Sequence, residues 1–90
     1  MNTTKLAQQD KHTILSTLVN ERIRTAMNEK GLSVAELASE SEMSLSTLRR
    51  RLSGKGQPFY VSEIAFLAVS LDKDLAWIFG ADLADRINAS

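Results

Sequence analysis

The 90-residue chain contains no cysteine, one proline and one histidine. The lack of cysteine excludes disulfide scaffolds and thiolate metal sites, and it is typical of proteins kept in a reducing cytoplasm. No apolar run approaches the roughly 20 residues that a membrane-spanning helix needs, and the polar first twelve residues lack the apolar core of a signal peptide. These absences predict a cytoplasmic protein that does not bind a membrane.

Groups for catalysis are scarce as well. His12 stands alone, and the acidic residues do not recur at the spacing of metal ligands. We therefore expect no enzyme activity, no catalytic residue, no metal, no cofactor and no small-molecule ligand. A solvated position is the simplest interpretation of His12.

Hydrophobic residues, at 43% of the chain, are sufficient for one small core. From about Lys11 to Lys30 they recur every three or four residues, which predicts an amphipathic helix ended by Gly31. Four more helices are predicted over about 34–40, 45–52, 61–71 and 75–79. No stretch alternates as a strand does, so the predicted class is all-α.

The predicted domain of five helices spans residues 11–80. Residues 1–10 are expected to form a flexible N-terminal arm. Either this polar start simply frays, or Lys5, with Lys11 and His12 just after the arm, adds contacts. Residues 81–90 are expected to form a partly helical tail. The chain thus reads as one small domain with two short extensions.

Local signals mark the ends of the central helices. Ser33 and Glu36 have the spacing of a capping box, and Ser44 is a plausible N-cap for the helix over 45–52. Two glycines and a proline within residues 53–58 predict the one clear loop. Two short helices separated by a tight turn are therefore expected over residues 34–52.

Charge is distributed unevenly, although the 11 basic and 11 acidic residues cancel. Residues 45–58 carry four bases and no acid: Arg49, Arg50, Arg51 and Lys55. On a helical wheel, Leu48 and Leu52 define the buried side, Arg50 lies opposite them, and the other two arginines flank the stripe. Two interpretations follow: a solvated cationic face with no partner, or a helix that enters the major groove of duplex DNA.

The stretch LSVAELASESEMSLSTLRRRLSG, residues 32–54, resembles the Xre-type helix-turn-helix family of lambda-repressor-like and Cro-like regulators. The capping Ser33, the Leu37-Ala38 pair, Ser44 and the closing Gly54 carry the resemblance. With the following FYVSEIAFLAVSLDKDLAWIFG it covers roughly residues 12–80. It implies a lambda-repressor-like five-helix domain, a double-stranded DNA operator as partner, a place in the bacterial cytoplasm or nucleoid, and transcriptional repression of phage or mobile-element type.

The wheel and the resemblance together assign the residues of this interface. Contacts to DNA bases are expected from Leu45, Ser46, Thr47, Arg49 and Arg50. Contacts to phosphates are expected from Ser33, Val34, Arg51, Ser53, Lys55 and Gln57, partly through the free N–H groups at helix starts. Leu45 is ambiguous, because the wheel turns it toward the core whereas the resemblance turns it toward a thymine methyl; we favour the second.

Two further departures from the family concern local structure. Glu42 stands in the turn where relatives often have glycine, so a positive φ there would cost roughly 1 kcal/mol. Tyr60 stands where many relatives have a capping serine or threonine, which leaves the start of the helix over 61–71 open.

Apolar residues toward the C-terminus allow two interpretations. They are either core or the contact of a homodimer that would read a two-fold-symmetric operator. The set comprises Phe66, Trp77, Phe79, Leu83 and Ile87. Two other functions remain possible for the whole chain: a helical protein-interaction module such as an adaptor or antirepressor, and the DNA-binding antitoxin of a toxin–antitoxin pair.

Overall fold

The structure, a computed structural model, describes the backbone of residues 3–82 and the side chains from Ser16 to Asp82. It contains five helices in this order: α1 Thr3–Lys30, α2 Val34–Glu40, α3 Leu45–Ser53, α4 Val61–Leu71 and α5 Leu75–Ile78. No strand occurs between residues 3 and 82. The expected all-α class is confirmed.

The N-terminal boundary differs from the prediction. Helix α1 begins at Thr3, eight residues before the expected start at Lys11, so residues 3–10 are helical rather than a flexible arm. The stretch contains neither proline nor glycine, and its leucine, alanine, glutamines and lysine favour helix. Apolar periodicity, which set the predicted boundary, is weak there and gave no signal.

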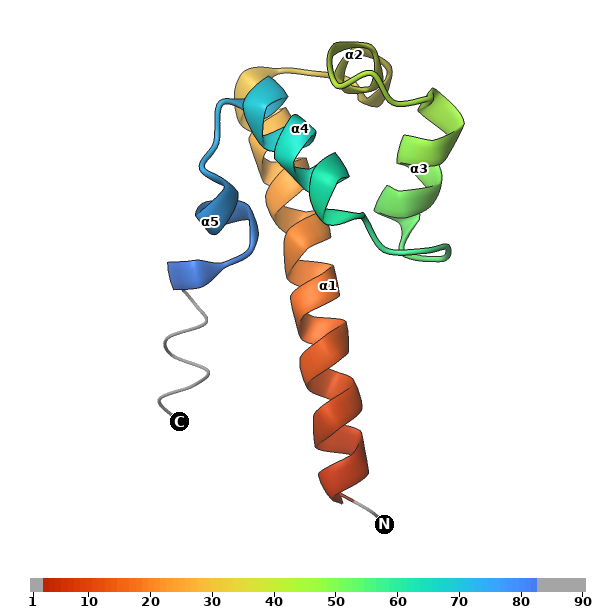
Figure 1. The fold of residues 1–90 in the computed structure, drawn as a ribbon, viewed down its shortest axis with the longest axis vertical. Coiled ribbons are helices and arrows are strands. Elements are labelled where there is room, and N and C mark those ends of the chain that lie inside the picture. The colour runs from red at the N-terminus through yellow and green to blue at the C-terminus, as the bar shows by residue number, and fades with distance from the viewer. Residues whose placement is uncertain (1–2, 83–90) are drawn as a thin grey trace.

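Helix α1 is the axis on which the other helices are arranged (Figure 1). Helices α4 and α5 pack on α1 and on each other, and α2 contacts both α3 and α4. The N-terminal half of α1 extends beyond the other described helices. Helix α3 therefore lies at the edge of the molecule, with one side toward the core and the other toward solvent.

The core joins all five helices. Its buried hydrophobic residues are Ile23, Ala26, Met27, Leu37, Ala38, Leu48, Leu52, Phe59, Ile64, Leu67, Ala68, Leu71 and Ile78. Periodicity predicted most of them. One buried residue was not predicted: Phe59, just before α4, is buried although no helical pattern marks it.

The turn between α2 and α3 consists of residues 41–44. Ser41 is buried and its hydroxyl donates to the Leu37 carbonyl oxygen at 2.6 Å, while the Met43 N–H donates to the Ala38 carbonyl oxygen at 3.0 Å. Glu42 has φ 59°, the left-handed conformation that the sequence made us suspect. These bonds fix the angle at which α3 leaves α2.

The later helices begin and end close to the predicted positions. Helix α4 starts at Val61, after Tyr60, whose N–H donates to Glu63 Oε1 at 2.8 Å. Gly80 follows α5 with φ 73°, and a Cβ at this position would clash with the side chain of Leu18. The chain thus turns tightly against α1 just before the end of the described residues.

Candidate nucleic-acid interface

Helix α3 is positioned by its cap and by two leucines. The Thr47 N–H donates to Ser44 Oγ at 3.2 Å, and Ser44 Oγ donates to Thr47 Oγ1 at 2.7 Å. Leu48 and Leu52 are buried, and Gly54 ends the helix in the left-handed conformation. The helix therefore turns a fixed, mostly polar face to solvent, as the wheel predicted.

The three consecutive arginines have different environments. Arg49 and Arg50 are exposed. Arg51 instead forms two bonds to the Glu63 carboxylate, from Nε to Oε1 at 2.8 Å and from Nη2 to Oε2 at 3.0 Å. Its side chain is only 11% exposed, and its guanidinium lies 5.0 Å from the centre of the Tyr60 ring.

Arg51 was expected to meet a phosphate, but in the structure its guanidinium is already paired with Glu63. The bonds to Glu63 raise the pKa of Arg51 above its ordinary value, so its charge persists but is matched within the protein. Glu63 also accepts the N–H of Tyr60, the residue before α4, so one carboxylate ties α3 to the start of α4. The wheel placed Arg51 at the edge of the buried stripe but could not show its partner, twelve residues away.

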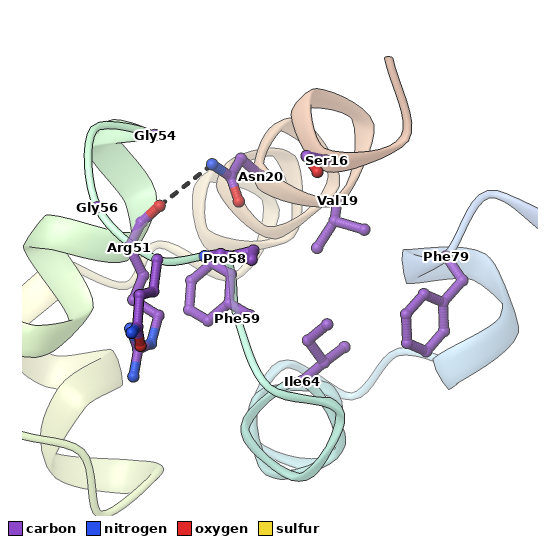
Figure 2. Close-up of a pocket in the computed structure, with 11 residues that line it drawn as sticks. Ser16, Val19, Asn20, Arg51, Gly54, Gly56, Pro58, Phe59, Ile64 and Phe79 are labelled. Carbon is purple, nitrogen blue, oxygen red and sulfur yellow. Dashed lines mark hydrogen bonds between the residues drawn. The ribbon is translucent and has the colours of Figure 1, made fainter. Parts of the chain in front are cut away.

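Two side chains of α1 complete the attachment of α3, and sequence reasoning missed both. Asn20 Nδ2 donates to the Arg51 carbonyl oxygen at 3.2 Å (Figure 2), and Arg24 Nη2 donates to the Leu52 carbonyl oxygen at 3.1 Å. Donors at the end of a helix satisfy carbonyl groups that have no partner within it. In the sequence, both residues look like ordinary polar positions of α1.

A pocket of about 420 Å³ lies beneath the segment that joins α3 to α4 (Figure 2). Val19, Phe59, Ile64 and Phe79 contribute its apolar lining. Arg51 is its only charged lining residue and is already paired with Glu63. Among the described residues, the pocket therefore presents apolar side chains to a ligand and no unpaired charged side chain.

The segment after α3 keeps one cation free. Ser53 Oγ donates to the Arg50 carbonyl oxygen at 2.6 Å and accepts the Lys55 N–H at 3.2 Å, so this hydroxyl serves the helix end. Gln57 is exposed and its Oε1 accepts the Tyr60 hydroxyl at 3.1 Å. Lys55 is exposed, with no side-chain partner among the described residues.

The start of α2 is less open to a phosphate than the sequence suggested. The predicted capping box is confirmed: the Ser33 N–H donates to Glu36 Oε1 at 3.0 Å, and the Glu36 N–H donates to Ser33 Oγ at 3.1 Å. The bond from the Ser33 backbone, with a smaller contribution from its hydroxyl, lowers the pKa of Glu36. A carboxylate thus already occupies this helix start.

Two apolar residues of the predicted interface lie toward the core. Leu45 and Val34 are half-buried and pack against the core cluster. The packing of Leu45 against the core agrees with the wheel, and the thymine contact that we favoured stays a prediction. Ser46 is exposed and Thr47 half-buried, so polar groups remain on the outer face of α3.

The predicted dimer contacts fall into separate groups. Phe66 and Phe79 are exposed. Trp77 is half-buried, and Arg22 and Lys73 lie over its ring at 4.6 and 4.8 Å from the centre. Trp77 is therefore engaged within the chain, whereas Leu83 and Ile87 lie outside the described residues.

Free positive charge is concentrated at one place. Between Ser16 and Asp82, only Arg49, Arg50 and Lys55 make no ion pair, side-chain hydrogen bond or ring contact. All three belong to α3 or to the segment after it. This surface, Arg49, Arg50 and Lys55, is called the cationic surface below.

Two structural searches bear on other classes of site. Between residues 3 and 82, no helix combines the length and apolar character needed to cross a membrane. Within the described residues, no group of three or more acidic or histidine side chains could hold a metal ion. These findings leave the cationic surface as the site to interpret.

Comparisons with known proteins provide no independent assignment. No protein-family model matches the chain, and neither a curated protein nor a solved structure does. The functional argument therefore rests on the residues and their geometry.

Proposed function

We propose that this chain is a sequence-specific, duplex-DNA-binding regulator of transcription, of the repressor or Cro-like kind, with α3 in the major groove. The observation that supports it is the cationic surface. Arg49, Arg50 and Lys55 are exposed and unpaired, while the other described cations are bonded within the protein. An anionic partner could therefore bind these three cations without breaking a bond within the described part of the protein.

The chemistry of this surface suits a DNA groove. An α-helix fits the major groove, where a guanidinium can donate two bonds to guanine O6 and N7. Arg50, opposite the buried leucines, is the proposed base-reading residue, with exposed Ser46 beside it. Lys55, in the segment after α3, is proposed to contact a phosphate, which fixes position without reading sequence.

Salt dependence tests this proposal quantitatively. Affinity would be measured by fluorescence anisotropy for a duplex enriched from a random library and for a scrambled duplex of the same composition. Because Arg50 is proposed to read a base, only Arg49 and Lys55 of the cationic surface can neutralise phosphates, so the logarithm of affinity should fall against the logarithm of salt with a slope of about −1 to −2 per bound chain. Failure to bind any duplex at 50 mM salt would overturn the proposal.

Two substitutions separate base reading from phosphate binding. Arg50→Ala should cost about 1–3 kcal/mol on the enriched duplex and little on the scrambled one, because the lost contact reads a base. Lys55→Ala should weaken both duplexes alike and reduce the salt slope by about 1. An equal loss on both duplexes for Arg50→Ala would show that it is not a base reader.

One observation favours a second candidate, a helical protein-interaction module. On α4, Val61, Phe66 and Val69 are 67%, 57% and 76% exposed, so this helix carries apolar residues on its outer side as well as in the core. The same titration decides between the two functions. Binding to no duplex would favour the module, whereas an antitoxin would bind DNA and also require a toxin chain.

A further inference from the structure

Gly56 lies in the segment between α3 and α4, and its backbone does not require glycine. Gly31, Gly54 and Gly80 have positive φ values of 71°, 74° and 73°, whereas Gly56 does not. An alanine at position 56 therefore meets no left-handed strain. Any effect of a side chain at position 56 must therefore come from the residues around it and not from its own backbone conformation.

The nearest of these residues is Arg50. A Cβ on Gly56 would lie 2.8 Å from Arg50 Cγ and 3.0 Å from Arg50 Cδ, closer than real Cβ contacts. The methylene stem of Arg50 thus occupies the space that a residue-56 side chain would fill. The guanidinium lies beyond this contact and has no partner among the described residues.

The wall against which Arg50 lies is itself fixed. Ser53 Oγ links the Arg50 carbonyl oxygen to the Lys55 N–H, and Gln57 accepts the Tyr60 hydroxyl. Phe59, two residues further on, is buried in the core. The segment is therefore tied to the end of α3 before Gly56 and to the core through Phe59 after it.

From this contact we infer that Gly56 is a specificity-determining residue that acts by positioning Arg50. The inference rests on the proposed function. A long arginine side chain loses rotamer freedom when it binds a base, and a stem already held against a wall loses less. A methyl group at position 56 displaces the stem and so weakens base reading without removing a charge.

A double-mutant cycle between Gly56→Ala and Arg50→Ala tests the inference. Gly56→Ala should lower the ratio of affinity for the enriched duplex to that for the scrambled duplex several-fold, with the scrambled affinity and the melting temperature unchanged. In the Arg50→Ala background, Gly56→Ala should have no further effect on the ratio. Lys55→Ala is the matched control in the same segment and should leave the ratio unchanged.

The outcomes separate this inference from the proposed function. If the wild-type protein binds DNA but Gly56→Ala leaves the ratio unchanged, the positioning role is wrong and the proposed function stands. A further loss in the Arg50→Ala background would mean that residue 56 acts independently of Arg50. If the wild-type protein binds no duplex at 50 mM salt, both the proposed function and this role are overturned.

Discussion

The cationic surface and the opposite part of the molecule, where α1 meets α4 and α5, differ in whether their positively charged side chains have acidic partners. In the second region each cation has an acidic partner: Arg22–Asp82 at 3.0 Å, Lys30–Asp72 at 3.0 Å and Lys73–Glu29 at 2.7 Å. On the cationic surface, Arg49, Arg50 and Lys55 have none among the described residues. The chain carries no net charge, but the described acidic residues pair with the cations of one region and leave those of the cationic surface unpaired.

This difference shows why net charge is a poor guide to partners. A paired cation contributes a dipole whose field falls quickly with distance, whereas unpaired cations on one surface add their fields. Taken alone, a zero net charge and a pI near 6.6 count mildly against a nucleic-acid partner. The distribution of ion pairs removes that argument.

The largest effect we expect distinguishes two arginines that are two residues apart. Arg51→Ala should lower the melting temperature markedly, because it leaves the Glu63 carboxylate, only 18% exposed, without its cationic partner. Arg49→Ala is the control, since Arg49 is exposed and unpaired, and it should change the free energy of unfolding by less than about 0.5 kcal/mol. Thermal unfolding followed by circular dichroism measures the stability of both variants. Equal melting temperatures would contradict the different roles assigned to Arg51 and Arg49.

The second prediction compares two charged residues in the left-handed conformation. Glu42, on the α2–α3 turn, has no side-chain partner among the described residues, whereas Asp72, after α4, is paired with Lys30. Glu42→Gly should raise the free energy of unfolding by about 1 kcal/mol by relieving strain. Asp72→Gly should gain less, because aspartate tolerates this conformation better and the substitution removes an ion pair.

Chemical denaturation of the two variants tests this pair. A lower or unchanged stability for Glu42→Gly would mean that the glutamate does more in the turn than adopt its backbone angle. A larger gain for Asp72→Gly than for Glu42→Gly would contradict the role assigned to the Lys30 pair.

The smallest expected effect is on the stability of the protein at acidic pH. Because the folded-state pKa of Glu36 lies below its ordinary value of 4.5, its stabilising contribution is complete above pH 4.5 and is lost as the pH falls through the lowered value. Glu36→Gln should therefore flatten the acid side of the stability curve slightly. Glu40→Gln removes a charge from the same helix outside the capping box, and an identical flattening for both variants would contradict the assignment.

Features of the fold that depend on residues close together in the sequence were predicted correctly. The Ser33–Glu36 capping box and the Ser44 cap were predicted from local patterns, and the structure confirms them. The buried leucines of α3 followed from helical spacing. In each case the deciding interaction lies within four residues along the chain.

What the sequence could not predict depends on residues that are distant along the chain. Arg51 is paired with Glu63, and the carbonyl groups at the end of α3 are bonded by Asn20 and Arg24, about thirty residues earlier. No periodicity encodes such partners. The packing of Leu45 against the core also differs from the direction that the resemblance favoured, because position in a motif does not fix the direction of a side chain.

The most direct test of the cationic surface is a map of backbone amide resonances during titration with the enriched duplex at low salt. We predict that the largest shifts fall within residues 44–57, on α3 and the segment after it, and that the paired cations of α1 and α4–α5 stay unchanged. Shifts centred on Val61, Phe66 and Val69, or no shift at any residue, would contradict the account.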